Sequence, residues 1–188
     1  MPVNFVLLIS RQGKVRLTKW YNTAAQKSKR ARGQTVREVC AMVLSRPSKL
    51  CNFLDYKGTK IVYKRYASLF FVACVDAGDN ELITLEIIHH YVEILDRYFG
   101  NVCELDIIFN FHKAYYVLDE LLINGELQET SKREILRVAA EQDDLMEGGI
   151  GGDGRGTVKG VVYNRPSMGA RANAMGRKVA ARVRRQLG

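Results

Sequence analysis

Paired cysteines, long apolar runs and catalytic signatures are all missing from this chain of 188 residues. Its four cysteines never form a CxxC pair and lie in apolar stretches, which favours buried free thiols over disulfides or metal ligands. Unpaired thiols are typical of a reducing compartment. No stretch of the sequence approaches the roughly 20 apolar residues of a membrane-spanning helix, and the N-terminal apolar run is too short for a signal peptide. We therefore expect a soluble, cytosolic protein.

The sequence also has none of the motifs GxxxxGK[ST], HExxH or GxSxG. Residues 149–154 match GxGxxG, but that motif needs a preceding strand and a following helix, so we interpret them as a Gly-rich linker. His89 and His90 are adjacent, so on a helix they point about 100° apart and cannot bind one ion together. The sequence therefore predicts a protein that is not an enzyme, with no catalytic residue, cofactor or metal site.

The net charge of +9 is unevenly distributed along the chain. Residues 1–65 carry 15 Lys and Arg against 2 Asp and Glu, residues 66–147 carry 5 against 17, and residues 148–188 carry 9 against 1. The first 147 residues are thus nearly neutral but bipolar, which suits partners of both signs. A uniformly basic nucleic-acid-binding domain would not have this distribution.

The start of the chain predicts a β-hairpin. Residues 3–9 form a near-continuous apolar run, which is typical of a central strand buried on both faces. Residues 14–21 alternate between polar and apolar, which is typical of a half-buried strand, and we expect Leu17 to face the core with Val15 beside it. The basic side chains of this strand should face solvent or a partner: Lys14 and Arg16.

The next part of the chain predicts one helix and three more strands. Residues 24–45 indicate a helix, because the apolar residues of its second half recur every three or four positions. Three segments rich in Phe, Tyr, Val and Ile favour β structure, with Lys57-Gly58 as a tight turn between the first two. These segments are residues 51–56, 59–66 and 68–75.

A long helix is predicted next. Asp79-Asn80-Glu81 opens it, and it runs to Phe99, with Gly100 as its stop. Two apolar stripes about 100° apart give this helix a wide apolar arc. One side can cover the sheet, so the other side needs another helix, a partner protein or a ligand.

Two more helices follow. Residues 104–124 show the same wide apolar arc, and we expect Asn124-Gly125 to end that helix. The capping-box pattern at residues 131–134 predicts a last helix to about Glu141.

This order of elements predicts an α+β fold, with a five-stranded antiparallel sheet flanked by helices. From Gly148 the composition changes, because ten of the 16 glycines lie in residues 148–188 and large apolar side chains are few. Such a segment cannot bury enough surface to fold alone. We therefore predict one domain at residues 1–146 and a basic, disordered tail at 147–188.

Four segments resemble the small (sigma) subunits of clathrin adaptor complexes. They are residues 10–21, 62–69, 79–82 and, as the longest, 98–111. The resemblance covers about residues 1–145 and looks closest to the adaptor of the trans-Golgi network and endosomes, with the small chain of the plasma-membrane adaptor as the near alternative. It implies a longin-like fold, in agreement with the element order above.

The resemblance also implies the partners. It implies an obligate heterotetramer of two large chains, a medium chain and this one, in which the apolar arcs at residues 82–99 and 105–123 are shared between the core and a large chain. It further implies vesicle-mediated protein transport and peripheral attachment to membranes of the trans-Golgi network, endosomes and clathrin-coated vesicles. Clathrin and an Arf-type GTPase would be contacted only through the large chains, and no nucleic acid is expected.

Recognition of acidic dileucine signals, of the form [DE]xxxL[LI], is implied as well. Arg16 resembles the residue that attracts the acidic side chain of the signal, and Asn101 resembles a polar contact to its backbone. The residues that resemble the walls of two leucine pockets are Ala67, Leu69, Val92, Val102 and Ile107. By position alone, Leu69, Val92 and Ile107 would be assigned to the core.

Two other classes of function remain open. One is a longin-type regulator of membrane fusion or tethering that has no cargo pocket. The other is RNA binding through the basic tail. Basic and aromatic residues also interleave at residues 60–66, as on a nucleic-acid platform, but an ordinary strand with one wet basic face is the favoured interpretation there.

Overall fold

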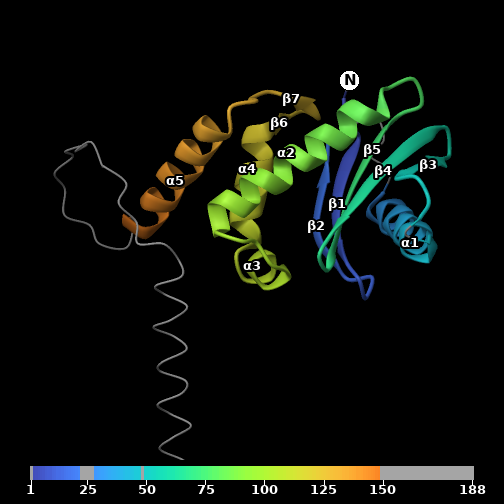
Figure 1. Cartoon of the computed structure of the whole chain (residues 1–188), viewed down its shortest axis with the longest axis horizontal. Coiled ribbons are helices and arrows are strands. Elements are labelled where there is room, and N and C mark those ends of the chain that lie inside the picture. The colour runs from blue at the N-terminus through green and yellow to red at the C-terminus, as the bar shows by residue number, and fades with distance from the viewer. Residues whose placement is uncertain (1, 22–27, 48, 149–188) are drawn as a thin grey trace, which may run out of the picture. The chain divides into compact units, whose positions relative to one another are not determined.

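A five-stranded antiparallel sheet forms the centre of the fold (Figure 1). The structure, a computed structural model, describes residues 2–21, 28–47 and 49–148. The strands lie in the order β2-β1-β5-β4-β3, and each neighbouring pair is antiparallel, as predicted. Their bounds are β1 Phe5–Ser10, β2 Val15–Trp20, β3 Phe53–Tyr56, β4 Thr59–Tyr66 and β5 Leu69–Asp76.

The chain divides into two units, Met1–Asp144 and Leu145–Gly188. The first unit contains the sheet and both of its apolar clusters. The second is described only as far as residue 148, where the last helix ends. The predicted disordered tail therefore lies almost entirely outside the described residues, as does the GxGxxG match, and the predicted boundary after residue 146 stays a prediction.

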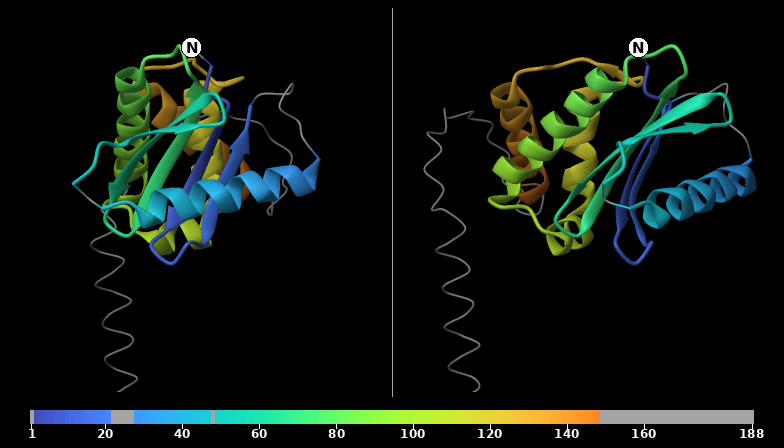
Figure 2. Two further views of the ribbon diagram at one scale, coloured as in Figure 1. Left: turned by 90° about the vertical axis from the view of Figure 1, so that its right-hand side faces the viewer. Right: turned by 45° about the vertical axis from the view of Figure 1, so that its right-hand side comes forward.

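Helices cover both faces of the sheet (Figure 2). Helix α1, Lys29–Ser45, lies on one face, and helix α2, Glu81–Phe99, lies on the other. All six residues of β1 are buried, because its side chains alternate between the two layers, as predicted for a strand buried on both faces. Phe5, Leu7 and Ile9 join the α1 cluster, and Val6 and Leu8 join the α2 cluster.

The hairpin between β1 and β2 contains a β-bulge that corrects one prediction. Leu8 pairs with Leu17, but Ile9 pairs with Val15, so Arg16 is the extra residue. Leu17 is buried as predicted, whereas Val15 is 38% exposed. The reason is that the bulge shifts the alternation by one residue, so Val15 and Leu17 no longer share a face.

Helix α1 begins later than the predicted residue 24. Ser28 is the N-cap, and its side chain accepts a hydrogen bond from the Ala31 N–H at 3.4 Å. Residues 24–27 lie outside the described part of the chain. Buried Val39, Cys40 and Val43 attach the second half of the helix to the sheet.

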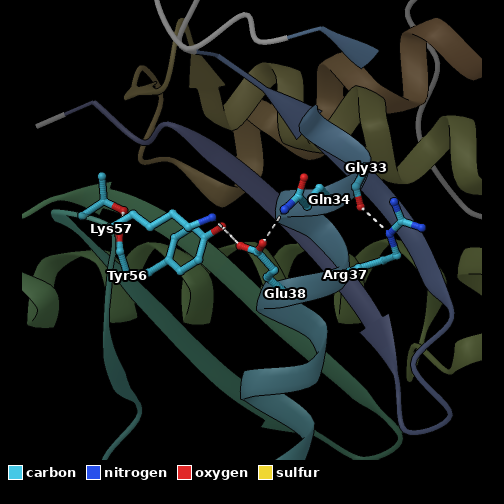
Figure 3. Close-up of polar contacts among 7 residues, drawn as sticks. Gly33, Gln34, Arg37, Glu38, Tyr56 and Lys57 are labelled. Atoms are coloured by element: carbon cyan, nitrogen blue, oxygen red, sulfur yellow. Dashed lines mark hydrogen bonds and ion pairs between the residues drawn. The ribbon is translucent and has the colours of Figure 1, made fainter. Parts of the chain in front are cut away.

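A polar cluster ties the exposed side of α1 to the β3–β4 turn (Figure 3). The Tyr56 hydroxyl donates to Glu38 at 2.6 Å, and the Lys57 ammonium donates to the same carboxylate at 2.5 Å. Gln34 donates to its second oxygen at 3.0 Å. These bonds, with that of Lys57 the largest cause, lower the pKa of Glu38 from 4.5 to about 2.

The four cysteines are free, as predicted, but only two are buried. Cys40 and Cys74 lie in the α1 cluster. Cys51 and Cys103 are exposed, which corrects the prediction of four buried thiols. Cys51 precedes β3, and Cys103 is the N-cap of the helix that begins at Glu104, so both lie outside the packed elements.

Helix α2 has the predicted limits. The Asn80 side chain caps its start by accepting from the Leu82 N–H at 2.9 Å. Gly100 ends it in the left-handed conformation, donating its N–H to the Asp96 carbonyl at 2.9 Å. The helix packs against β4 and β5 on one side and against α4, Phe111–Leu121, on another. Its wide apolar arc is therefore covered mainly by its own chain.

The predicted helix over residues 104–124 is wrong as a single element. It is two helices, α3 Glu104–Phe109 and α4, which are separated at Asn110. Strands β6 Leu122–Ile123 and β7 Glu126–Leu127 follow as a short hairpin. Asn124-Gly125 does not cap a helix but forms the two-residue turn of this hairpin, with φ values of 52° and 83°, as Asn-Gly favours.

The last helix is α5, Lys132–Gly148. Ser131 begins it as predicted, accepting from the Glu134 N–H at 3.4 Å, but it runs beyond the predicted end at Glu141. Asp143 lies past that end and is 3% exposed. It pairs with the Lys113 ammonium at 2.9 Å and accepts from the Tyr98 hydroxyl, so these contacts extend the helix.

Candidate functional site

A groove opens between the β4–β5 turn, the second half of α2 and the α2–α3 loop. It encloses about 410 Å³. Three of the residues predicted for the leucine pockets line it together, although they are far apart in the sequence: Ala67, Val92 and Val102. Tyr66 and three charged residues of α2 complete the lining: Glu93, Asp96 and Arg97. The groove thus combines an apolar floor with a charged rim.

Backbone geometry places Val102 in this groove. Gly100 and Asn101 have φ values of 67° and 64°, so the chain reverses direction directly after α2. Asp96 holds the reversed loop, because its carbonyl accepts from the N–H groups of Gly100 and Asn101. Its carboxylate accepts from the Val102 N–H at 3.1 Å. The predicted polar residue Asn101 is exposed at the bend of this loop.

Leu69 and Ile107 do not line the groove. They are 4% and 0% exposed, respectively, and both belong to the apolar cluster beneath α2. The structure therefore brings together one predicted pocket wall, and leaves the other two predicted wall residues in the core. Val92 contributes to both environments, because it is only 8% exposed yet reaches the groove.

Arg16 is half-buried and paired. Its Nε and Nη2 atoms both donate to Glu104 Oε1, at 3.1 and 2.9 Å. Its side chain is 22% exposed and that of Glu104 is 24% exposed. It was expected to face solvent or a partner, and within this chain the bulge turns it toward α3, while Lys14 is exposed as predicted.

The charged rim of the groove was not predicted as part of a site. Glu93 lies at this rim. It pairs with the Lys132 ammonium of α5 at 2.5 Å, and this bond lowers the pKa of Glu93. Next to it, the Tyr66 hydroxyl lies 3.0 Å from His89 Nδ1. Positions 92, 93, 96 and 97 lie on one face of the helix, and this spacing could have indicated from the sequence that they line one site.

The basic residues of β4 are engaged within the chain. Lys60 pairs with Glu81 of α2. Lys64 lies over the ring of Tyr66, and Arg65 lies over that of Phe70. The interleaved basic and aromatic side chains thus contribute to packing of this fold.

Apolar side chains remain exposed at the α3–α4 corner. Leu105, Phe109 and Phe111 are 58%, 75% and 54% exposed. Helix α4 buries Ala114, Val117, Leu118 and Leu121 against the rest of the chain. Both apolar arcs therefore leave bulky side chains uncovered near their starts, because Leu82 and Ile83 of the first arc are 66% and 51% exposed.

Within residues 2–21, 28–47 and 49–148, no three His, Cys, Asp or Glu residues lie close enough to hold a metal ion. Helices that are long and apolar enough to cross a membrane are likewise absent from that part of the chain.

Comparison with known proteins identifies the family. The family model described as clathrin adaptor complex small chain matches residues 2–146. That range contains the sheet, the groove and nearly all of the helices that cover them. The chain belongs to the clathrin adaptor complex small-chain family. It is thus a small subunit of an adaptor complex for vesicle trafficking and not an enzyme, and its sheet and helices confirm the predicted longin-like fold.

Individual relatives agree with this assignment. The chain is 66% identical over 151 residues to AP-1 complex subunit sigma-2 of Dictyostelium discoideum, which covers 80% of this chain and 96% of that protein. It is 55% identical over 145 residues to the human AP-1 complex subunit sigma-1A, covering 77% and 89%. Among structures, a chain in a homology model of the full-length AP-3 complex in a stretched open conformation matches with a TM-score of 0.61 and 28% identity, covering 79% and 97%.

Proposed function

We propose that this chain is the small subunit of an AP-1-type heterotetramer, which sorts membrane cargo at the trans-Golgi network and endosomes. In that complex it recognises acidic dileucine signals. It assembles with two large chains and one medium chain, and it attaches to the cytoplasmic side of membranes as part of the complex. Its similarity to sigma subunits of AP-1 complexes supports this choice of complex.

The groove is the observation that carries the cargo proposal. Ala67, Val92 and Val102 come from three separate elements and meet at one apolar floor. Arg16 lies nearby, because it bonds to Glu104, two residues after Val102. An apolar pocket beside a cation is the arrangement that an acidic residue followed by leucines would require.

One leucine of the signal fits the groove directly, and the second needs a rearrangement. Leu69 and Ile107 can line a second pocket only if α3, which carries Ile107, moves away from the core. Helix α3 is short, with left-handed residues before it and the break at Asn110 after it. We propose that it is the segment that moves when cargo binds.

The exposed apolar corner formed by Leu105, Phe109 and Phe111 is proposed as a contact with a large chain. Bulky apolar side chains at this exposure are costly in water and are typical of subunit interfaces. Clathrin and an Arf-type GTPase would then be reached through the large chains.

A groove substitution tests the proposal. The chain is co-expressed with its large and medium partners, and binding of a peptide with the pattern [DE]xxxL[LI] is measured by titration calorimetry. Val102→Asp, which puts a carboxylate on the apolar floor, should weaken binding by about tenfold or more. Leu50→Asp is the matched control, because Leu50 is 50% exposed in the loop between α1 and β3, and it should leave the affinity unchanged.

Co-purification of the four chains shows whether each variant still assembles. Equal affinity of the Val102→Asp and wild-type complexes would contradict the groove assignment. If the wild-type complex does not bind the peptide, the cargo proposal fails, and a longin-type regulator without a cargo pocket becomes the better interpretation.

A further inference from the structure

The cation proposed to attract the cargo signal already has an acidic partner. Both donors that Arg16 directs at Glu104 reach the same oxygen, Oε1, at 3.1 and 2.9 Å. The two side chains are 22% and 24% exposed, so water reaches the pair without separating it. The Glu104 carboxylate therefore accepts the guanidinium hydrogen bonds of Arg16 that a carboxylate of the cargo signal would accept.

The pair connects two elements beside the groove. Arg16 is the bulged residue of the edge strand β2, and its side chain reaches Glu104 of α3. Glu104 is the first residue of α3 and follows Val102, which lines the groove, by two positions. A peptide whose leucine enters the groove and whose acidic side chain reaches Arg16 must therefore also meet Glu104.

We propose that Glu104 is a built-in competitor for the acidic residue of the cargo signal, an inference that rests on the function proposed above. The acidic side chain gains less from Arg16 than from an isolated cation, because it displaces or shares an existing bond and meets a like charge. Glu104 thereby sets how strongly the acidic residue contributes to binding. The affinity for the cargo peptide then depends more on its leucines, so an acidic residue without the leucines does not suffice for binding.

The test compares two peptides on the assembled complex. One carries Glu at the acidic position and the other carries Gln there, with the leucines unchanged in both. In the Glu104→Gln complex the Glu peptide should bind about three- to fivefold tighter than in wild type. A partly exposed ion pair changes a binding affinity by about this factor. The Gln peptide should bind equally to both complexes, because it does not compete for Arg16.

The matched control is Glu81→Gln. Glu81 also pairs with a basic residue, Lys60, and its side chain is 31% exposed, but it begins α2 and does not line the groove. This variant should leave both affinities unchanged.

Three results would overturn the inference. If Glu104→Gln leaves the Glu peptide unchanged or weakens its binding, Glu104 does not compete. If it tightens both peptides equally, Glu104 restrains α3 rather than competing for Arg16. If neither peptide binds the wild-type complex, the proposed function fails, and the inference fails with it; the first two results leave that function intact.

Discussion

Replacing Gly125 with alanine should destabilise this chain much more than the same change at Gly58. Each glycine is the second residue of a two-residue hairpin turn, with φ values of 83° and 79°. Alanine in a left-handed conformation costs about 1 kcal/mol at either position. The surroundings differ, however, because a Cβ at Gly58 would have nothing within 4 Å.

A Cβ at Gly125 would lie 2.3 Å from the Val3 carbonyl oxygen and 3.2 Å from Tyr21 Cβ. The backbone must shift to relieve this contact, and the shift weakens the hydrogen bond from the Val3 N–H to the Gly125 carbonyl, now 2.7 Å. Losing that bond costs about 1 kcal/mol, and disturbing Val3, which is 1% exposed, costs at least as much again. We therefore expect a loss of about 3 kcal/mol at Gly125 and about 1 kcal/mol at Gly58.

Urea unfolding of the two variants measures both losses. The single tryptophan, Trp20, gives the signal, because it lies in β2 with its ring 4.6 Å from that of Phe5. Equal losses of free energy for Gly125→Ala and Gly58→Ala would refute the close approach of the β6–β7 turn to Val3.

Two further predictions concern Ile107 in the core and the polar cluster around Glu38. Ile107→Ala should reduce the free energy of unfolding by about 2–5 kcal/mol in the same assay, because Ile107 is fully buried. Leu105→Ala, at a side chain 58% exposed, should cost less than about 0.5 kcal/mol, and similar losses would place Ile107 outside the core. Lys57 and Tyr56 lower the pKa of Glu38 from 4.5 to about 2, so its stabilising effect is complete above about pH 4.5 and is lost as the pH falls to about 2. The stability difference between wild type and Glu38→Gln should shrink over that range, and a constant difference would contradict the cluster.

Most of the fold could be predicted because each strand and helix carries a local signal. The apolar run of β1 and the capping Asn80 and Gly100 of α2 specify their elements without reference to the rest of the chain. The predicted single helix over residues 104–124 failed because its apolar residues continue through Asn110, where the break depends on tertiary packing. Asn-Gly at 124–125 was the missed signal, since this pair favours a hairpin turn over a helix cap.

The candidate site was harder to predict because it depends on contacts between distant segments. The bulge at Arg16 changes which face its side chain occupies, and no pattern within β2 reveals an extra residue. Family resemblance indicated five wall residues, of which the structure brings Ala67, Val92 and Val102 together. The acidic partner Glu104 lies 88 residues from Arg16 in the sequence and could be identified only once the two were seen in contact.

Titration of an acidic dileucine peptide into the assembled complex with Arg16→Ala tests the central claim most directly. The account predicts binding about three- to fivefold weaker than in wild type, because the partly exposed ion pair with the acidic residue of the signal is lost. Lys14→Ala, which removes the same charge from an exposed position two residues away, should bind as wild type does. Unchanged affinity with Arg16→Ala, or equal losses in the two variants, would contradict the claim that this residue anchors the acidic residue of the signal.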